Sequence, residues 1–178
     1  MQLTIGQKVA YPNQGVCLVE EIKKRMVGEN PLIGYCLRVL GDNSTIFVPE
    51  ANTDSVGLRP LISSSQCKRL IFTLGADFDP TMGDWKSRSR EFSEKLHSGD
   101  VFEAAEVLKK LTFLSFDKKL SFREQTMLEK AKFLVVSEIS NADRKDHDRM
   151  EAEVCDLVQS ACLKCRLAEP QALSATVH

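Results

Sequence analysis

The first sixty residues contain short apolar runs that alternate with polar positions and are separated by glycine and proline. The runs are Lys8–Tyr11, Val16–Val27, Tyr35–Leu40 and Thr45–Val48. In the second run, Val16, Leu18 and Ile22 fall on one face of an extended chain. Short strands of this kind must curl to cover their one apolar face. The pattern therefore predicts a small SH3-like or Tudor-like antiparallel β-barrel.

After Pro60 the apolar positions follow a helical period, and glycine and proline become rare. Four helix starts are marked by good N-cap residues, which are Ser63, Asp84, Asp100 and Ser121. A fifth helix is expected from about Asp143 to Leu167, and the tail from Pro170 has no pattern. The predicted class is α+β with two domains, a β-barrel at residues 1–60 and an all-α bundle of about five helices at residues 61–178.

Composition places the chain among ordinary soluble proteins. Its 178 residues are 43% hydrophobic and 28% charged, and 24 Lys and Arg nearly balance 25 Asp and Glu, so the whole chain lacks a basic signature. No apolar run approaches the ~18 residues that a membrane span needs, and the N-terminus has no leader pattern. We expect a cytoplasmic protein that does not bind membranes, with its six cysteines reduced.

The only tryptophan lies among closely spaced cations. With Asp84 as N-cap, Trp85 occupies the first turn of a helix, close to Arg88, and Lys86 and Arg90 lie one turn apart. An exposed apolar ring beside phosphate-seeking groups is one interpretation. The other is a core position, because Trp85 shares a helical stripe with apolar residues that follow it.

A second cationic segment spans residues 109–123. It contains Lys109, Lys110, Lys118, Lys119 and Arg123 against a single acidic residue, Asp117. These cations could join those around Trp85 in one phosphate-binding patch. They could equally belong to a solvated loop.

The sequence offers little support for catalysis or metal binding. Cys162 and Cys165 form a CxxC pair, but a structural zinc site usually takes four ligands from two pairs, and no second pair exists. Phosphate-binding glycine loops, zinc-protease motifs and nucleophile elbows are absent from the sequence. We therefore expect a two-part binding protein that is not an enzyme and has no cofactor.

Several motifs in order resemble the CarD/CdnL family of bacterial transcription regulators. In the first domain they are Gly6–Gly15, Tyr35–Arg38, Val48–Pro49 and Asp54–Arg59. In the helical domain they are Trp85–Arg90, Glu94–Asp100, Ala105–Leu108 and Leu120–Ala131. The resemblance covers about residues 3 to 140.

The resemblance implies a specific role for each domain. The family's first domain is similar to the polymerase-interacting domain of transcription-repair coupling factor and binds the β subunit of RNA polymerase. Arg25 matches a basic position used against polymerase, and Phe47 stands where some members place a cation. The family's helical domain lies on promoter DNA at the upstream edge of the melted region, with little base specificity. The residue matching Trp85 enters the minor groove there and stabilises the open complex, and the cations near it match as well.

The expected protein is therefore a non-catalytic, nucleoid-associated regulator that acts as a monomer. The DNA-binding residues are expected to be Trp85, Lys86, Arg88, Arg90, Lys109, Lys119 and Arg123. The alternative is an adaptor that binds RNA polymerase and another protein without contacting DNA. A phosphate-binding surface should lose affinity steeply with salt, whereas an apolar protein-binding groove should not.

Overall fold

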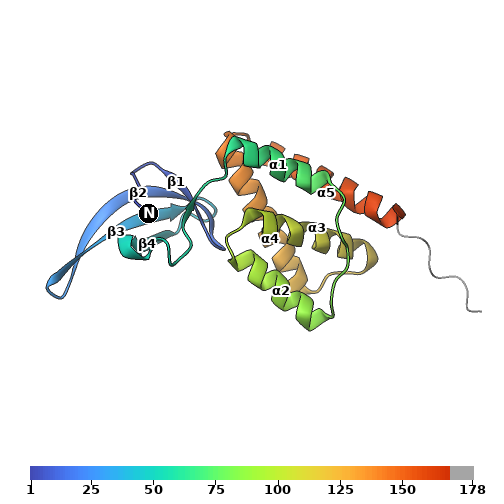
Figure 1. Ribbon diagram of the computed structural model, residues 1–178, viewed down its shortest axis with the longest axis horizontal. Helices are drawn as coiled ribbons and strands as arrows, with labels where there is room; N and C mark the ends of the chain where they lie inside the picture. The colour runs from blue at the N-terminus through green and yellow to red at the C-terminus, as the bar shows by residue number, and fades with distance from the viewer. Residues whose placement is uncertain (169–178) are drawn as a thin grey trace, which may run out of the picture.

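The computed structural model describes residues 1–168, in which a curved antiparallel sheet is followed by five α-helices (Figure 1). The predicted two-part α+β architecture is confirmed. The tail from Pro170, for which the sequence predicts no regular element, lies outside the described residues. No helix among the described residues is both long and apolar enough to cross a membrane.

The sheet has the strand order β4-β3-β2-β1-β5, and every neighbouring pair is antiparallel. Its elements are β1 (Lys8–Tyr11), β2 (Gly15–Val27), β3 (Asn30–Val39), β4 (Thr45–Pro49), the 3-10 turn η1 (Glu50–Asn52) and β5 (Arg59–Pro60). One face buries a compact apolar core that includes Val9, Val19, Leu37 and Val48. The β2–β3 hairpin is longer than this core and projects away from the helices (Figure 1).

A bulge in β2 changes which residues share a face. The register shifts between Val19 and Glu21, which inserts one extra residue into the strand. Beyond the bulge Ile22 lies opposite buried Tyr35, on the core face, whereas Val16 lies before the bulge on the other face. The predicted common face of Val16 and Ile22 is therefore wrong, because one inserted residue reverses the alternation.

The helices begin at the predicted capping residues. They are α1 (Ser64–Gly75), α2 (Trp85–His97), α3 (Val101–Asp117), α4 (Phe122–Asp143) and α5 (His147–Ala168). Ser63 and Ser121 form capping boxes, and the carboxylates of Asp84 and Asp100 accept from first-turn N–H groups. The fifth helix starts later than predicted, because α4 continues to Asp143 and a turn separates it from α5.

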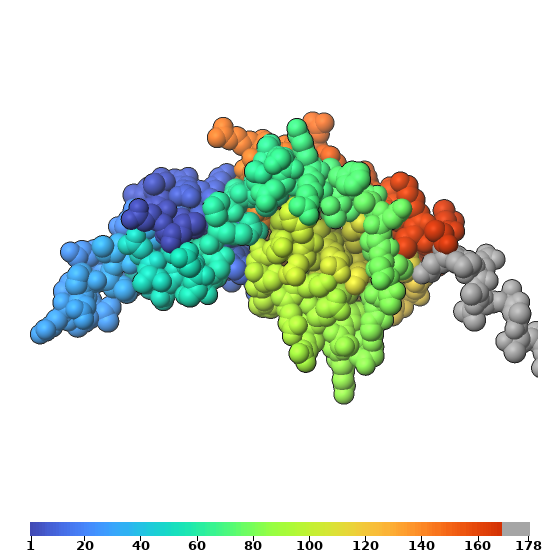
Figure 2. Space-filling model, viewed as in Figure 1, coloured from blue at the N-terminus to red at the C-terminus, as the bar shows by residue number. Residues whose placement is uncertain are grey.

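The bundle has its own apolar core, separate from that of the sheet. Residues from all five helices contribute, among them Leu70, Phe92, Leu111, Ile139 and Met150. The sheet and the bundle are nevertheless in contact, and the space-filling view shows the two joined along one side (Figure 2). The main contact between them is formed by β2 and α4.

Candidate nucleic-acid interface

Trp85 is the first residue of α2, and its ring is exposed. The Asp84 carboxylate accepts a 2.8 Å hydrogen bond from the Ser87 N–H, which fixes the helix start at Trp85. Phe92 and Leu96, further along the same stripe, are buried, whereas Trp85 remains 51% exposed. Both interpretations of the stripe thus hold in part, since its later residues anchor α2 and its first residue reaches solvent.

A buried carboxylate joins the start of α2 to the start of α4. Glu124, with a side chain only 3% exposed, accepts from Arg88 at 3.0 Å and from Lys118 at 3.1 Å. Its other oxygen accepts from the N–H and hydroxyl of Ser121, each at 2.9 Å. Arg88 also donates to the Gly83 carbonyl at 3.1 Å, so the loop before Trp85 is tied into the same network.

The electrostatics of this network favour the ionised carboxylate. Burial alone would raise the pKa of Glu124, but hydrogen bonds from Ser121, Arg88 and Lys118 outweigh burial and lower the pKa to about 2. The Arg88 side chain is only 12% exposed in this bridge. The prediction that Arg88 faces phosphate is therefore corrected, because its guanidinium is used to hold the start of α2 against α4.

The sequence reasoning missed Phe122, an aromatic residue that is 91% exposed. Phe122 directly follows the N-cap Ser121, so it occupies the first position of α4, as Trp85 does in α2. The bridge from Arg88 to Glu124 connects the first turns of these two helices. The capping box could have drawn attention to Phe122, because the residue after an N-cap lies at the open end of its helix.

Several cations at this end of the bundle are accessible. Lys86, Lys119 and Arg123 are exposed, and within residues 1–168 no acidic side chain forms an ion pair with them. Arg90 is also exposed and pairs with Glu94 at 2.9 Å, an i,i+4 contact that solvent weakens. The positive dipole ends of α2 and α4 add to this field. We call the surface formed by Trp85, Lys86, Arg90, Lys119, Phe122 and Arg123 the bundle-end surface.

Lys109 does not belong to the bundle-end surface, and its predicted role in DNA binding is wrong. The residue is 3% exposed, and its ammonium group donates to the carbonyls of Thr73 at 2.7 Å and Ala76 at 2.6 Å. It also lies 4.8 Å from the centre of the Phe78 ring. Burial lowers the pKa of Lys109. The lysine therefore satisfies carbonyls at the end of α1 and cannot reach a phosphate.

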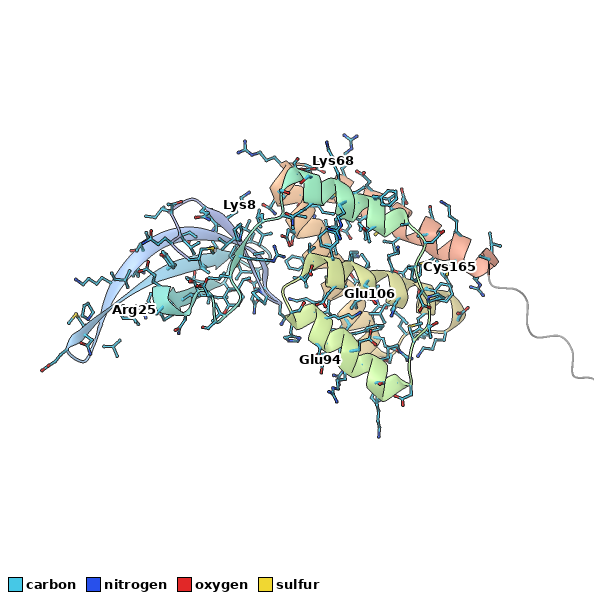
Figure 3. All side chains as sticks on the ribbon, in the orientation of Figure 1. Lys8, Arg25, Lys68, Glu94, Glu106 and Cys165 are labelled. Carbon is cyan, nitrogen blue, oxygen red and sulfur yellow. The ribbon has the colours of Figure 1, made fainter. Side chains whose placement is uncertain are left out.

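The two residues predicted to face polymerase contact each other on the sheet. The Arg25 guanidinium lies 4.6 Å from the centre of the Phe47 ring. Phe47 covers Gly34 so closely that a Cβ there would overlap the ring. Phe47 belongs to β4, which is at one edge of the sheet. Figure 3 shows Arg25 on the projecting hairpin, on the other side of the molecule from Glu94 of α2.

The cysteines of α5 have structural contacts. The Cys162 thiol donates to the carbonyl of Lys109 at 3.5 Å, and Cys165 donates to the carbonyl of Phe78 at 3.7 Å. Burial raises the pKa of Cys162 to about 12, despite the opposing charge of Lys109. Among the described residues, no group of three or more His, Cys, Asp or Glu side chains could hold a metal ion.

Comparison with known proteins gives matches over both parts of the chain. The family model described as the CarD-like/TRCF RID domain matches residues 3–62, and the model described as the CarD C-terminal domain matches residues 69–155. A curated relative from Bacillus subtilis (strain 168), the putative transcription factor YdeB, is 26% identical over 135 residues. That alignment covers 76% of this chain and 88% of the relative.

One solved structure with sequence similarity is the 72-residue N-terminal domain of Myxococcus xanthus CarD, determined by solution NMR. It is 37% identical to the matched part of this chain. The match covers 33% of this chain and 79% of the other, with a TM-score of 0.29.

Proposed function

This chain belongs to the CarD family of transcription regulators, and from that premise we propose that it binds RNA polymerase and promoter DNA together and stabilises the open complex. Residues 1–60 bind the β subunit, and residues 61–178 bind DNA at the upstream edge of the melted region. The protein acts without catalysis and as a monomer.

The observation that carries the DNA-binding proposal is the exposed Trp85 ring at the first position of α2, beside accessible cations. An apolar ring that enters the minor groove must unstack bases, which costs a few kcal/mol per step and least where the duplex is already distorted. The edge of a melted region meets that condition. Phe122 supplies a second apolar ring at the same end of the bundle.

The cations around these rings are suited to binding phosphate groups. Lys86, Arg90, Lys119 and Arg123 lie at or near two helix starts, where the helix dipoles also favour anions. Phosphate contacts fix position and carry no sequence information directly. The bundle-end surface therefore supports binding to many promoters with little base specificity.

The polymerase-facing surface is proposed for the outer face of the sheet. The match of residues 3–62 to the CarD-like/TRCF RID domain supports an interaction with RNA polymerase. Arg25 and Phe47 form one cation–π pair there, next to the free edge of β4. An edge strand can add to a strand of a partner through its main chain.

The first test is the lifetime of promoter open complexes. Trp85→Ala should shorten the lifetime, and Phe122→Ala should shorten it less, while both variants keep the affinity for polymerase. Phe72→Ala is the matched control, because Phe72 is an exposed aromatic residue, 76% accessible, on α1. Equal lifetimes for Trp85→Ala and wild type would remove Trp85 from the mechanism.

Salt dependence separates DNA binding from the adaptor alternative. Each lost phosphate contact should reduce the slope of log K against log salt by about 0.9. Lys86→Gln should show this reduction on promoter DNA, and Lys68→Gln on α1 should not (Figure 3). A helical domain that binds another protein in place of DNA would show no difference between the two variants.

The polymerase surface is tested by charge reversal on β2. Arg25→Glu should lower affinity for the isolated β subunit, because it places a carboxylate beside the Phe47 ring. Lys24→Glu is the matched control, since Lys24 is the adjacent residue of the strand and points to the opposite face. If both reversals weaken binding equally, the loss reflects net charge and not this contact.

A further inference from the structure

The contact between the sheet and the bundle centres on the middle of α4, which supplies a charged residue, Glu138, and an aromatic residue, Phe133. We infer that this interface locks the two domains into one geometry, with Glu138 and Phe133 as positioning residues for open-complex stabilisation. The inference rests on the proposed function, because it concerns how the polymerase-facing and DNA-facing surfaces are held relative to each other.

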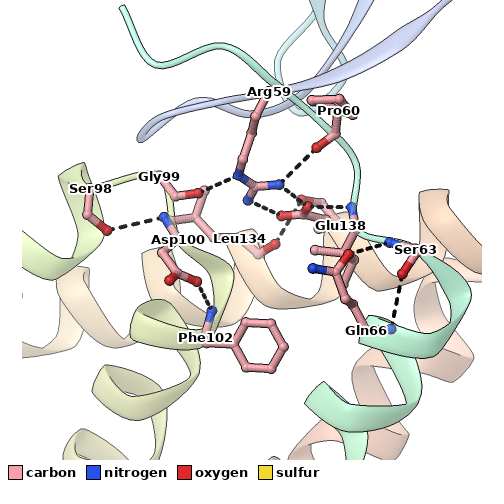
Figure 4. A network of polar contacts seen from close by, with 12 residues as sticks. Arg59, Pro60, Ser63, Gln66, Ser98, Gly99, Asp100, Phe102, Leu134 and Glu138 are labelled. Atoms are coloured by element: carbon pink, nitrogen blue, oxygen red, sulfur yellow. Dashed lines mark hydrogen bonds and ion pairs between the residues drawn. The ribbon is translucent and has the colours of Figure 1, made fainter.

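Glu138 is the centre of a charged clamp between three segments (Figure 4). Its two oxygens accept from Arg59 of β5 at 2.5 and 2.8 Å, in a bidentate pair. One of them also accepts from the Ile62 N–H at 3.1 Å. Arg59 in turn donates to the Gly99 carbonyl, in the turn between α2 and α3, at 2.8 Å. The Glu138 side chain is 6% exposed, so solvent screens this clamp weakly.

Phe133 fits a notch that only glycine leaves open. A Cβ on Gly15 would come within 2.9 Å of the Phe133 ring, and a Cβ on Gly41 would come within 2.5 Å. Real Cβ atoms are not found at such distances, so a side chain at either glycine would displace the Phe133 ring from this position. Phe133 belongs to neither buried core, which leaves the domain interface as its packing site.

Further contacts close the rest of the interface. Pro12, in the β1–β2 turn, packs against Gly99, where an added Cβ would lie 2.9 Å from the proline ring. Lys8 donates to Asn141 at 2.8 Å, one turn after Glu138 on α4. The enclosed cavity at this contact has a volume of only ≈ 20 Å³, about the space of one water. An open groove of ≈ 700 Å³ lies beside it, between β5 and the starts of α1 and α3, so the contacts named above, and not complete filling of the interface, restrict rotation of the domains.

The same helix carries the interface and one ring of the bundle-end surface. Phe122 begins α4, and Phe133 lies three turns later, about 16 Å along the axis at 1.5 Å per residue. A rigid helix therefore transmits the position of the sheet to the bundle end. Rigid linkage raises the effective concentration of the second binding event and removes the ordering cost that a hinged pair would incur.

The clamp variants are Glu138→Gln, Phe133→Ala and their combination. Glutamine keeps the volume and can still accept from Ile62 N–H, but loses the charge that Arg59 needs. Glu129→Gln is the matched control, since it makes the same chemical change on an exposed side chain of α4. Because both domains keep their own cores, helical circular dichroism and urea unfolding should show folded proteins for all variants.

Residual dipolar couplings report domain geometry without reference to transcription. In the wild type and in Glu129→Gln, couplings from the sheet and from the bundle should fit one alignment tensor. In the combined variant they should need two tensors of different magnitude. A single tensor for the combined variant overturns the inference.

The functional measurement compares two quantities in the same variants. The combined variant should keep the wild-type affinity for the isolated β subunit, while its open complexes dissociate about tenfold faster, a part of the roughly 10²- to 10⁴-fold gain that linkage of two sites can supply. Independent domains with an unchanged lifetime would overturn the inference, as would a loss of β-subunit affinity. If the wild type itself does not prolong open complexes, the proposed function fails, and the couplings still decide whether the domains are locked.

Discussion

Replacing Glu124 by Gln should destabilise the helical domain at neutral pH and remove part of its acid sensitivity. The substitution keeps the shape of the side chain and one acceptor for the Ser121 N–H. It removes the charge that pairs with Arg88, whose side chain is 12% exposed, and with Lys118. Breaking a buried ion pair is costly because the remaining partner keeps its charge and stays largely shielded from water.

The magnitude follows from the pKa of Glu124. A decrease in the pKa from the usual 4.5 to about 2 corresponds to at most roughly 3.5 kcal/mol, since one pKa unit is worth about 1.4 kcal/mol. Because the folded pKa is lower than the unfolded one, this stabilisation is present above 4.5 and is lost as the pH falls toward 2. Wild type and Glu124→Gln should therefore differ most at neutral pH and converge in acid.

Urea unfolding followed by helical circular dichroism, at pH 7 and at about pH 3, measures the difference in stability between the two proteins and its dependence on pH. Glu94→Gln is the matched control, because its pair with Arg90 is exposed to solvent and should contribute little to stability. A difference for Glu124→Gln no larger than that control, or one that stays constant between the two pH values, would falsify the account of this network.

Three other substitutions test single features. Ser89→Ala should raise stability by about 0.5 to 1 kcal/mol in urea unfolding, because the buried Ser89 hydroxyl has no hydrogen-bond partner within residues 1–168; a loss of stability would reveal an unrecognised contact. Burial lowers the pKa of Lys109, so just below pH 10.5 the unfolded chain binds this proton where the folded chain does not. The wild type should therefore become more stable relative to Lys109→Met as the pH rises toward 10.5, as measured by urea unfolding. If the stability of wild type falls relative to that of Lys109→Met as the pH rises, the sign is contradicted. Gly34→Ala should displace the Phe47 ring, lower stability by about 1 to 3 kcal/mol and weaken binding to the β subunit; unchanged β-subunit affinity would separate Phe47 from that surface.

Local features of this protein could be predicted from the sequence because their causes lie within a few residues. Ser63 and Ser121 mark helix starts through hydrogen bonds to residues three positions later. Asp84 fixes the start of α2 in the same way, which places Trp85 at the open end of its helix. The motifs that indicate the family are also short segments, and the matches at residues 3–62 and 69–155 confirm them.

Only the tertiary structure decided which charged residues face solvent. Lys109 and Lys119 look alike in sequence, but the end of α1 lies against Lys109 and buries it. Arg88 is drawn into a bridge with Glu124, which is 36 residues away along the chain. Burial of a charge depends on which partner another segment delivers, and sequence periodicity does not contain that information.

The relation between the two domains was likewise decided in three dimensions. Arg59 and Glu138 are 79 residues apart, and the notch for Phe133 is formed by two glycines from different turns of the sheet. A single inserted residue in β2 reversed the face of Ile22, which alternation alone could not show. The sequence by itself determined the elements, their order and the place of Trp85 at the start of α2, because capping and periodicity act locally. The tertiary structure determined how those elements meet, because long-range packing selects among faces that are locally equivalent.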